Sequence, residues 1–289
     1  MSDIGRLNGI ISAWQQGRPA FASFTPADRR AAVEFSSGPY DGIVFEMEHN
    51  PWDALALQDA LQYLLNRRQI HDAGSLAPAV TPLVRIPANG EEKNQWLAKQ
   101  ALDRGAYGVV WPHIRTAEEA YNAVSACRYP RPKTAPLLEP LGTRGDGPTA
   151  AARYWGLSQK EYYARADVWP LNPSGEILVL LMIESSQGLA NLDEILRRVP
   201  GIGCIVIGEG DLSQELGYPR QYEHPVVKEA MGHIVQTCKK HDVPVGHPHV
   251  TGKNLESVLE QGYRFLMASP VRSHAVVEKG REIASAAKK

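Results

Sequence analysis

The chain has 289 residues, of which 43% are hydrophobic and 22% are charged, as is normal for a globular protein of one large domain or two modest ones. Its 31 basic and 32 acidic residues nearly cancel, so neither nucleic acid nor a membrane surface is expected as a partner, and no apolar run approaches the roughly 20 residues that cross a bilayer. The N-terminal stretch Met1–Arg6 lacks the apolar core of a signal peptide, and three widely spaced cysteines, Cys127, Cys204 and Cys238, favour a reducing, cytoplasmic setting over disulfides or a thiolate zinc site.

Short apolar runs recur along the chain in alternation with segments of helical periodicity. Most of the runs show no apolar–polar alternation, as expected of strands that are covered on both faces. In chain order the predicted strands are Pro19–Phe24, Gly42–Glu46, Pro82–Ile86, Gly108–Trp111, Ile177–Ile183, Gly203–Ile207, Pro244–Gly246 and Arg264–Met267. The predicted helices between them are Trp52–Asn66, Glu91–Arg104, Thr116–Ala126, Gly188–Arg198, Pro225–His241 and Gly252–Gln261. This α/β pattern predicts a (β/α)8 TIM barrel that forms a single domain over residues 1–289.

An open, doubly wound sheet is the main alternative fold. Such a sheet usually carries a Gly-rich fingerprint after its first strand, and the sequence has none there. One long insertion, Arg128–Gly175, separates the fourth and fifth predicted strands. Its glycines and proline predict an exposed loop at the mouth of the barrel, and its aromatic residues predict that it packs as a lid or a subunit contact. We expect residues 275–289 to form a last helix that could contact a neighbouring subunit.

Two carboxylates stand just past neighbouring apolar strands. Glu184 follows Ile177–Ile183, and Asp211 lies in the turn that follows Gly203–Ile207. Because parallel strands deliver the residues after them to one edge of the sheet, the two acids can converge on a hard cation, which prefers oxygen ligands. The alternative is that each acid only caps the helix that follows it.

The other predicted strand ends carry more polar residues to the same edge. Glu46, Glu48 and His49 end the second strand, Arg85 lies near the end of the third, and Ser269–Arg272 follow the eighth. Burying so many charges without a function would be costly. Their coincidence with the two acids therefore indicates an active site at the carboxyl end of the barrel.

Each of these residues also has a structural interpretation. His49 could simply cap or pack at a strand end, or it could be a general base beside Glu48. Arg85 could be an ion-pair partner for Glu46 or Glu48, or its planar fork could bind a carbonyl or carboxylate oxygen. Asp103 is most simply a helix surface residue, yet it could orient His49.

A pair of histidines ends the seventh predicted strand. His247 and His249 are two residues apart, so on a strand they point the same way and could grip a divalent metal or be structural. The absence of cysteine ligands and the presence of paired acids favour Mg²⁺ or Mn²⁺ over zinc.

Five stretches carry a resemblance to a known family. In chain order they are Gly42–His49, Val84–Pro87, Leu102–Ala106, Met182–Glu184 and Ile207–Ser213. The chain resembles the HpcH/HpaI aldolase family, the class II 2-oxo-acid aldolases related to 4-hydroxy-2-oxoheptanedioate aldolase and, more distantly, to the citrate lyase β subunit. With weaker matches, the resemblance covers most of residues 15–275. It implies a (β/α)8 barrel that assembles as a homo-oligomer, a hexamer or a trimer.

The resemblance also implies the parts of an active site. A divalent metal, Mg²⁺ or Mn²⁺ with Co²⁺ or Zn²⁺ as alternatives, would be held by Glu184 and Asp211. His49 would be the base, oriented by Asp103, and Arg85 would polarise the substrate carbonyl.

The implied substrate contacts include the clearest departures from the family pattern. Glu48 would bind metal-held water, and the turn Gly208-Glu209-Gly210 would hold the donor carboxylate through its backbone N–H groups. The family usually has Pro-Ala where this turn has Glu209-Gly210, and Gln where this chain has Met182. An acid at 209 should repel the donor unless it points away or pairs with a cation such as Arg272.

The implied activity is that of a metal-dependent aldolase, a carbon–carbon lyase that cleaves or forms 4-hydroxy-2-oxo acids through a pyruvate-type enolate. Its partners would be a small 2-oxo acid and an aldehyde. No lysine stands at a predicted strand end, which agrees with a metal route over a Schiff base. The alternatives are a citrate lyase-like enzyme, a decarboxylase or hydratase that uses the same ligands, and a non-catalytic barrel.

Overall fold

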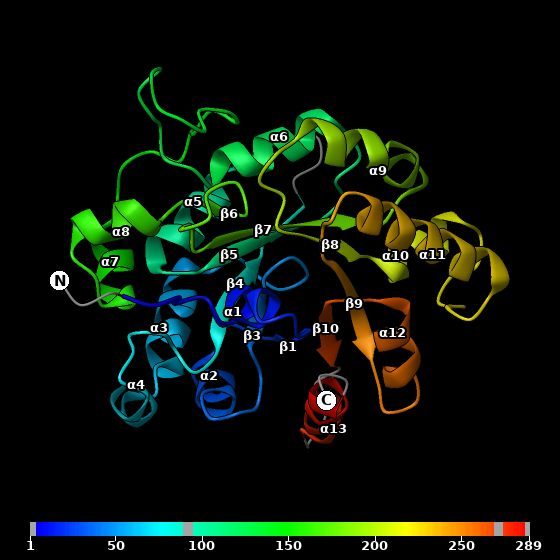
Figure 1. Ribbon diagram of the computed structural model, residues 1–289, viewed down its shortest axis with the longest axis horizontal. Coiled ribbons are helices and arrows are strands. Elements are labelled where there is room, and N and C mark those ends of the chain that lie inside the picture. The colour runs from blue at the N-terminus through cyan, green and yellow to red at the C-terminus, as the bar shows by residue number, and fades with distance from the viewer. Residues whose placement is uncertain (1–3, 89–94, 269–273, 287–289) are drawn as a thin grey trace.

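The computed structural model describes residues 4–88, 95–268 and 274–286, and their strands form one parallel barrel (Figure 1). The strands are β1 (Ala20–Ala22), β2 (Phe24–Thr25), β3 (Gly42–Glu46), β4 (Thr81–Arg85), β5 (Gly108–Trp111), β6 (Val168–Trp169), β7 (Ile177–Ile183), β8 (Cys204–Ile207), β9 (Val245–Val250) and β10 (Phe265–Ala268). They pair in the order β1-β10-β9-β8-β7-β5-β4-β3-β2. Every one of the eight predicted strands is confirmed, and the short β6 is an addition.

The barrel closes because β1 and β2 are one strand interrupted at a single residue, Ser23. β1 pairs with β10 on one side, and β2 pairs with β3 on the other. At the interruption the Ser23 carbonyl accepts the Val44 N–H at 2.8 Å, and its hydroxyl donates to the Ala268 carbonyl at 3.1 Å. These bonds carry the ring of strands across the break, so the open-sheet alternative is excluded.

Helices surround the strands. They are α1 (Gly9–Gln15), α2 (Arg29–Phe35), α3 (Ala54–Leu64), α4 (Arg67–Ala73), α5 (Gln95–Arg104), α6 (Ala117–Ala126), α7 (Thr149–Trp155), α8 (Gln159–Arg165), α9 (Ser186–Arg198), α10 (Glu209–Glu215), α11 (Pro225–Lys240), α12 (Leu255–Gln261) and α13 (Ala275–Ala286). Local signals set several boundaries: a Thr116/Glu119 capping box starts α6, and Gly262, with φ +90°, ends α12. The six helices predicted between strands are all present, although the first residues of the predicted Glu91–Arg104 lie outside the described residues. None of the described helices is long and apolar enough to cross a membrane.

Alternate residues of each strand face the barrel interior and the outer helices. The interior cluster includes Val44, Leu83, Val110, Leu178, Leu180, Met182, Cys204, Val206, Phe265 and Met267. α1 plugs the amino end of the barrel with Ile10 and Ile11, and a Cβ at Gly42 would lie 2.5 Å from the Ile10 side chain. The same alternation turns Glu46, Arg85 and Glu184 inward at the opposite, carboxyl end.

The long insertion lies at the amino end of the barrel, which corrects the expectation of a loop at the mouth. It contains α7, α8 and β6, and Figure 1 shows α7 and α8 beside the N-terminal segment. The Trp155 indole donates to the Gly105 carbonyl at 2.9 Å, and Arg165 pairs with Glu176 at the start of β7. The reason is topological: the insertion follows α6, and that helix has already returned the chain to the start of the strands.

The last helix, α13, packs on the barrel of its own chain. A Cβ at Gly280 would lie 2.5 Å from the Phe21 ring, Val277 is fully buried, and Arg281 pairs with Asp41 at 3.1 Å. Residues 287–289 of the predicted helix lie outside the described residues. Contact with a neighbouring subunit stays a prediction.

Candidate active site

Arg85 lies at the carboxyl end of the barrel between two carboxylates. Its Nε donates a hydrogen bond to Glu46 Oε2, its Nη2 pairs with the same oxygen, and its Nη1 is 3.1 Å from Glu48 Oε2. The sulfur of Met182 lies below it, 3.8 Å from Nη1. The Arg85 side chain is therefore fixed in position, while its Nη1 faces the interior of the barrel mouth. The ion pairs that sequence analysis considered for Arg85 are both present.

Glu46 organises the turn that carries the expected base. Its Oε1 accepts the backbone N–H of Glu48 at 2.9 Å and that of His49 at 3.1 Å. His49 itself is open to solvent, with 69% of its side chain exposed, and its Nε2 is 3.7 Å from Glu48 Oε2. The turn thus presents an accessible imidazole next to a buried carboxylate.

Glu184 and Asp211 converge as predicted, and a histidine that sequence analysis missed joins them. Glu184 is only 3% exposed, and its Oε1 accepts the backbone N–H of His113. A ligand atom of each of His113, Glu184 and Asp211 lies within 4.8 Å of the others. Gly208 makes room for this arrangement, because a Cβ there would lie 2.3 Å from Glu184 Oε2.

His113 could have been found from its position. It stands two residues after the predicted strand Gly108–Trp111, and therefore at the same carboxyl edge as the other candidates.

The Glu184 and Glu48 carboxylates of the site have raised pKa values, as expected of an acidic site that a bound cation would stabilise. Burial raises the pKa of Glu184 to about 7, and the Asp211 carboxylate adds to that effect against the opposing His113 N–H and Arg85 charge. Burial likewise raises the pKa of Glu48 to about 7, with Arg85 lowering it and Glu184 raising it. Within the described residues, the carboxylates of Glu48, Glu184 and Asp211 share the positive charge of one guanidinium, that of Arg85, which already pairs with Glu46 and Glu48. A donor set of two carboxylate oxygens and an imidazole fits a divalent cation.

Asp103 is not brought to His49 in this chain. It accepts hydrogen bonds from the Nε and Nη2 of Arg144 at 3.2 and 3.0 Å. It lies near the end of α5, and a helix that follows a barrel strand ends near the start of the next strand, at the amino end. The expectation that Asp103 orients His49 is therefore not met within this chain. The acid beside His49 is Glu48.

Glu209 pairs with two histidines of β9. It is only 2% exposed, the Nδ1 of His249 hydrogen-bonds to its Oε1, and the Nε2 of His247 is 3.9 Å from its Oε2. The three residues line a separate cavity of about 670 Å³ outside the cluster. The negative charge of Glu209 is thus directed at these histidines and not at the backbone of Gly208–Gly210. The alternative cation partner, Arg272, lies outside the described residues.

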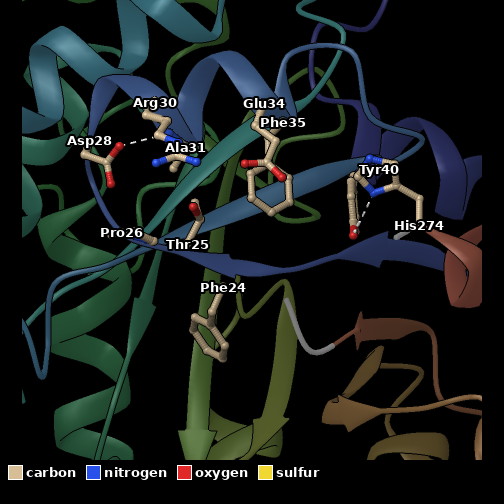
Figure 2. A pocket seen from close by; sticks show the side chains of 10 residues that line it. All are labelled: Phe24, Thr25, Pro26, Asp28, Arg30, Ala31, Glu34, Phe35, Tyr40 and His274. Carbon is tan, nitrogen blue, oxygen red and sulfur yellow. Dashed lines mark hydrogen bonds between the residues drawn. The ribbon is translucent and has the colours of Figure 1, made fainter. Parts of the chain in front are cut away.

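A further cavity, of about 360 Å³, lies between β2 and α2 (Figure 2). Tyr40 and His274 hydrogen-bond to each other at one side of it, at 3.3 Å. Phe24 belongs to its lining, and its ring also lies 4.6 Å from the guanidinium carbon of Arg85. Phe24 therefore links this cavity to the site, because its ring supports the Arg85 guanidinium from the β2 side.

Comparison with known proteins identifies the relatives of this chain. The model of the family described as HpcH/HpaI aldolase/citrate lyase matches residues 21–275. The chain is 30% identical to a 2-dehydro-3,6-dideoxy-6-sulfogluconate aldolase of Pseudomonas putida, over 93% of this chain and 95% of that protein. It is 28% identical to a hydroxypyruvate/pyruvate aldolase of Paraburkholderia phytofirmans, over 90% of each. A crystal structure of an HpcH/HpaI aldolase/citrate lyase family protein from Burkholderia cenocepacia superposes with a TM-score of 0.74 and 26% identity, over 98% of this chain and 100% of that one.

Proposed function

The chain belongs to the HpcH/HpaI aldolase/citrate lyase family and is an aldolase, and we propose that it breaks and forms the carbon–carbon bond of 4-hydroxy-2-oxo acids through a pyruvate-type enolate. Its substrates are then a small 2-oxo acid donor and an aldehyde acceptor. The name of the relative from Paraburkholderia phytofirmans contains hydroxypyruvate and pyruvate, which supports a three-carbon donor.

The carboxylates of Glu184 and Asp211 hold the divalent cation in this proposal. Their oxygens are the ligands that Mg²⁺ and Mn²⁺ prefer, and Co²⁺ and Zn²⁺ are the alternatives. When bound, the cation supplies a Lewis acid that stabilises negative charge on the 2-oxo oxygen of the donor. The glycine at 208 supports the assignment, because a side chain there would displace the Glu184 carboxylate.

Arg85 binds the donor from the opposite side. Its Nη1 lies 3.1 Å from Glu48 Oε2 and 3.8 Å from the Met182 sulfur and would offer its second N–H to the donor, while Glu46 holds the Nε and Nη2 edge in place. A preorganised guanidinium next to the 2-oxo oxygen stabilises the charge that develops there as the enolate forms. The backbone of Gly208–Gly210 receives the donor carboxylate, free of the side chain of Glu209.

His49 moves the proton. Its imidazole is accessible at the mouth, and it takes a proton from the carbon next to the 2-oxo group or returns one to it. Glu48 Oε2 lies 3.7 Å from its Nε2, so Glu48 can orient the imidazole. Glu48 takes the place that the resemblance gave to Asp103.

The observation that carries this proposal is the convergence of the Glu184 and Asp211 carboxylates, with Arg85 at the same carboxyl end of the barrel. Deuterium exchange into the methyl group of pyruvate, followed by NMR in ²H₂O, tests it without knowledge of the aldehyde. We expect exchange with Mn²⁺ or Mg²⁺ present and none after chelation. Glu118→Gln, which changes an exposed acid on α6, should exchange like the wild type. A wild type that catalyses no exchange with any of the four metals contradicts the proposal.

We also propose that the chain forms a homo-oligomer, a hexamer or a trimer, as the family resemblance implies. Light scattering that gives the 31.8 kDa mass of one chain would contradict this.

A further inference from the structure

His113 has a backbone conformation that few side-chain-bearing residues adopt. Its φ is +56°, in the left-handed region, and its N–H donates to Glu184 Oε1. Such conformations persist where the surrounding structure demands them, and they gather at functional sites. Here the conformation brings the imidazole back over the same carboxylate that its own N–H binds.

The imidazole lies between a buried carboxylate, Glu184, and a partly buried one, Glu48. Its Nδ1 is 3.6 Å from Glu184 Oε1, and its Nε2 is 3.6 Å from Glu48 Oε1. One ring nitrogen thus faces the cluster with Asp211, and the other faces an acid outside it. Metal-bound histidines commonly have this arrangement, in which the second ring nitrogen donates to a carboxylate that fixes the tautomer and the ring orientation.

The spacing of the cluster suits one cation. Carboxylate and imidazole ligands lie roughly 2.0–2.2 Å from a transition metal, so two ligand atoms of one ion can be no more than about 4.4 Å apart. The 3.6 Å between Nδ1 and Glu184 falls within that limit, and the ligand atoms of all three residues lie within 4.8 Å of one another. A small side-chain adjustment therefore places all three on one ion.

We propose that His113 is a third protein ligand of the cation, through Nδ1, and that it makes the site select Mn²⁺, Co²⁺ or Zn²⁺ over Mg²⁺. The inference rests on the proposed function, since the cation is the one held by Glu184 and Asp211. Imidazole nitrogen is a good ligand for transition metals, whereas Mg²⁺ is bound chiefly through oxygen. Glu48 then acts on the metal through His113, in addition to its contacts with Arg85 and His49.

The other histidines near this end of the barrel do not compete for the role. His247 and His249 both face Glu209, and neither belongs to a group of three possible ligands within the part of the chain that the structure describes. His49 extends into solvent beside Glu48.

Pulsed electron paramagnetic resonance of the Mn²⁺-loaded protein tests the proposal directly, because it detects nitrogen nuclei bound to the metal. We expect a ¹⁴N signal from the wild type that changes when the histidines are labelled with ¹⁵N. His113→Gly should lose the signal, since glycine accepts the positive φ and keeps the N–H to Glu184 while it removes the imidazole. His249→Ala is the matched control: it removes another carboxylate-paired imidazole from the same rim and should keep the signal.

Calorimetric titration gives an independent measure. Loss of an outer partner of a metal ligand typically costs roughly 10-fold to 100-fold in affinity, so loss of His113 itself should weaken Mn²⁺ and Co²⁺ binding by at least about 10-fold. Mg²⁺ affinity should change less, so the preference of the site for Mn²⁺ and Co²⁺ over Mg²⁺ should become smaller in the variant. If the glycine variant does not fold, His113→Asn, which also tolerates a positive φ, replaces it.

The outcomes separate the two proposals. Mn²⁺ that binds to the wild type without a nitrogen signal, or a signal that survives in His113→Gly, overturns the role of His113 and leaves the proposed function standing. A wild type that binds none of the four metals overturns the metal-dependent function itself, and this inference with it.

Discussion

Glu46 and Arg85 stand directly opposite each other on β3 and β4, and the carboxylate of Glu46 accepts hydrogen bonds from Arg85 while it also accepts the backbone N–H groups of Glu48 and His49. One partly buried acid therefore holds in place both the arginine on one strand and the histidine on the turn after the other, the two residues proposed to bind the donor and to move the proton. In the proposed mechanism, this single side chain would couple substrate binding to proton transfer.

The pair of Glu46 and Arg85 should behave as a unit. Arg85→Lys keeps the charge but loses the planar fork, so kcat/KM should fall by about 10²-fold or more. Glu46→Gln should also impair turnover, because the amide holds the guanidinium less firmly. In a double-mutant cycle the two changes should couple by roughly 0.5–3 kcal/mol. Strict additivity, or full activity of Arg85→Lys, would mean that the ion pair is only structural.

Substitution of either proposed metal ligand should weaken metal binding without unfolding the protein. Glu184→Gln or Asp211→Asn removes one anionic oxygen, and calorimetry should show strongly weakened Mn²⁺ binding. The circular dichroism spectrum should stay native, because Asp211 is exposed and Gln keeps the shape of Glu184. Glu118→Gln serves as the control. Unchanged Mn²⁺ affinity in both ligand variants would contradict the assignment of Glu184 and Asp211 as the metal site.

His49 should be needed for proton transfer and not for metal binding. His49→Ala should slow the exchange of pyruvate methyl protons by roughly 10²-fold or more. Mn²⁺ affinity should stay close to that of the wild type, since His49 is outside the ligand cluster. Exchange at the wild-type rate would exclude His49 as the base.

Glu209 should have little influence on the donor. Its carboxylate is directed at His249 and His247, so the expected repulsion of a donor carboxylate does not arise. Glu209→Gln should leave the KM for pyruvate unchanged, and so should Glu209→Pro combined with Gly210→Ala, which restores the usual family turn. A clear fall in KM for either variant would show that the acid at 209 does act on the donor.

Asp167 should contribute stability that depends on pH. Burial opposes its charge, but hydrogen bonds and the charges of Arg128 and Arg131 hold the pKa of Asp167 below its ordinary value of 3.8. Asp167→Asn breaks a buried ion pair and should cost about 3–5 kcal/mol of the free energy of unfolding at neutral pH. Asp193→Asn, at an exposed pair with Lys240, should leave the melting temperature nearly unchanged.

The sign of the pH dependence follows from the lowered pKa. The contribution of Asp167 is complete above the unfolded pKa and is lost as the pH falls through the lower, folded pKa. The difference in unfolding free energy between the wild type and Asp167→Asn should therefore begin to shrink near pH 3.8 and disappear only at lower pH, below the folded pKa. A difference that stays constant into strong acid would be inconsistent with an ionised Asp167 as its source.

The sequence by itself was sufficient for the barrel and for the residues at its carboxyl edge. Runs such as Ile177–Ile183 are apolar at every position, and that property is local, so their order predicts parallel strands without knowledge of their partners. Residues at the end of such a run or shortly after it lie at the carboxyl end of the sheet, and this predicts one site for Glu184, Asp211 and Arg85.

Only the tertiary structure decided which side chains meet at that edge. The backbone of His113 turns to a positive φ and adds a nitrogen to the cluster, Glu209 swings out to His249, and Asp103 binds Arg144 at the opposite end of the barrel. These partners come from strands and helices that are distant in sequence. A local pattern shows where a residue leaves its strand, but the direction of its side chain depends on rotamers, burial and neighbouring charge, and these exist only once the whole barrel has closed.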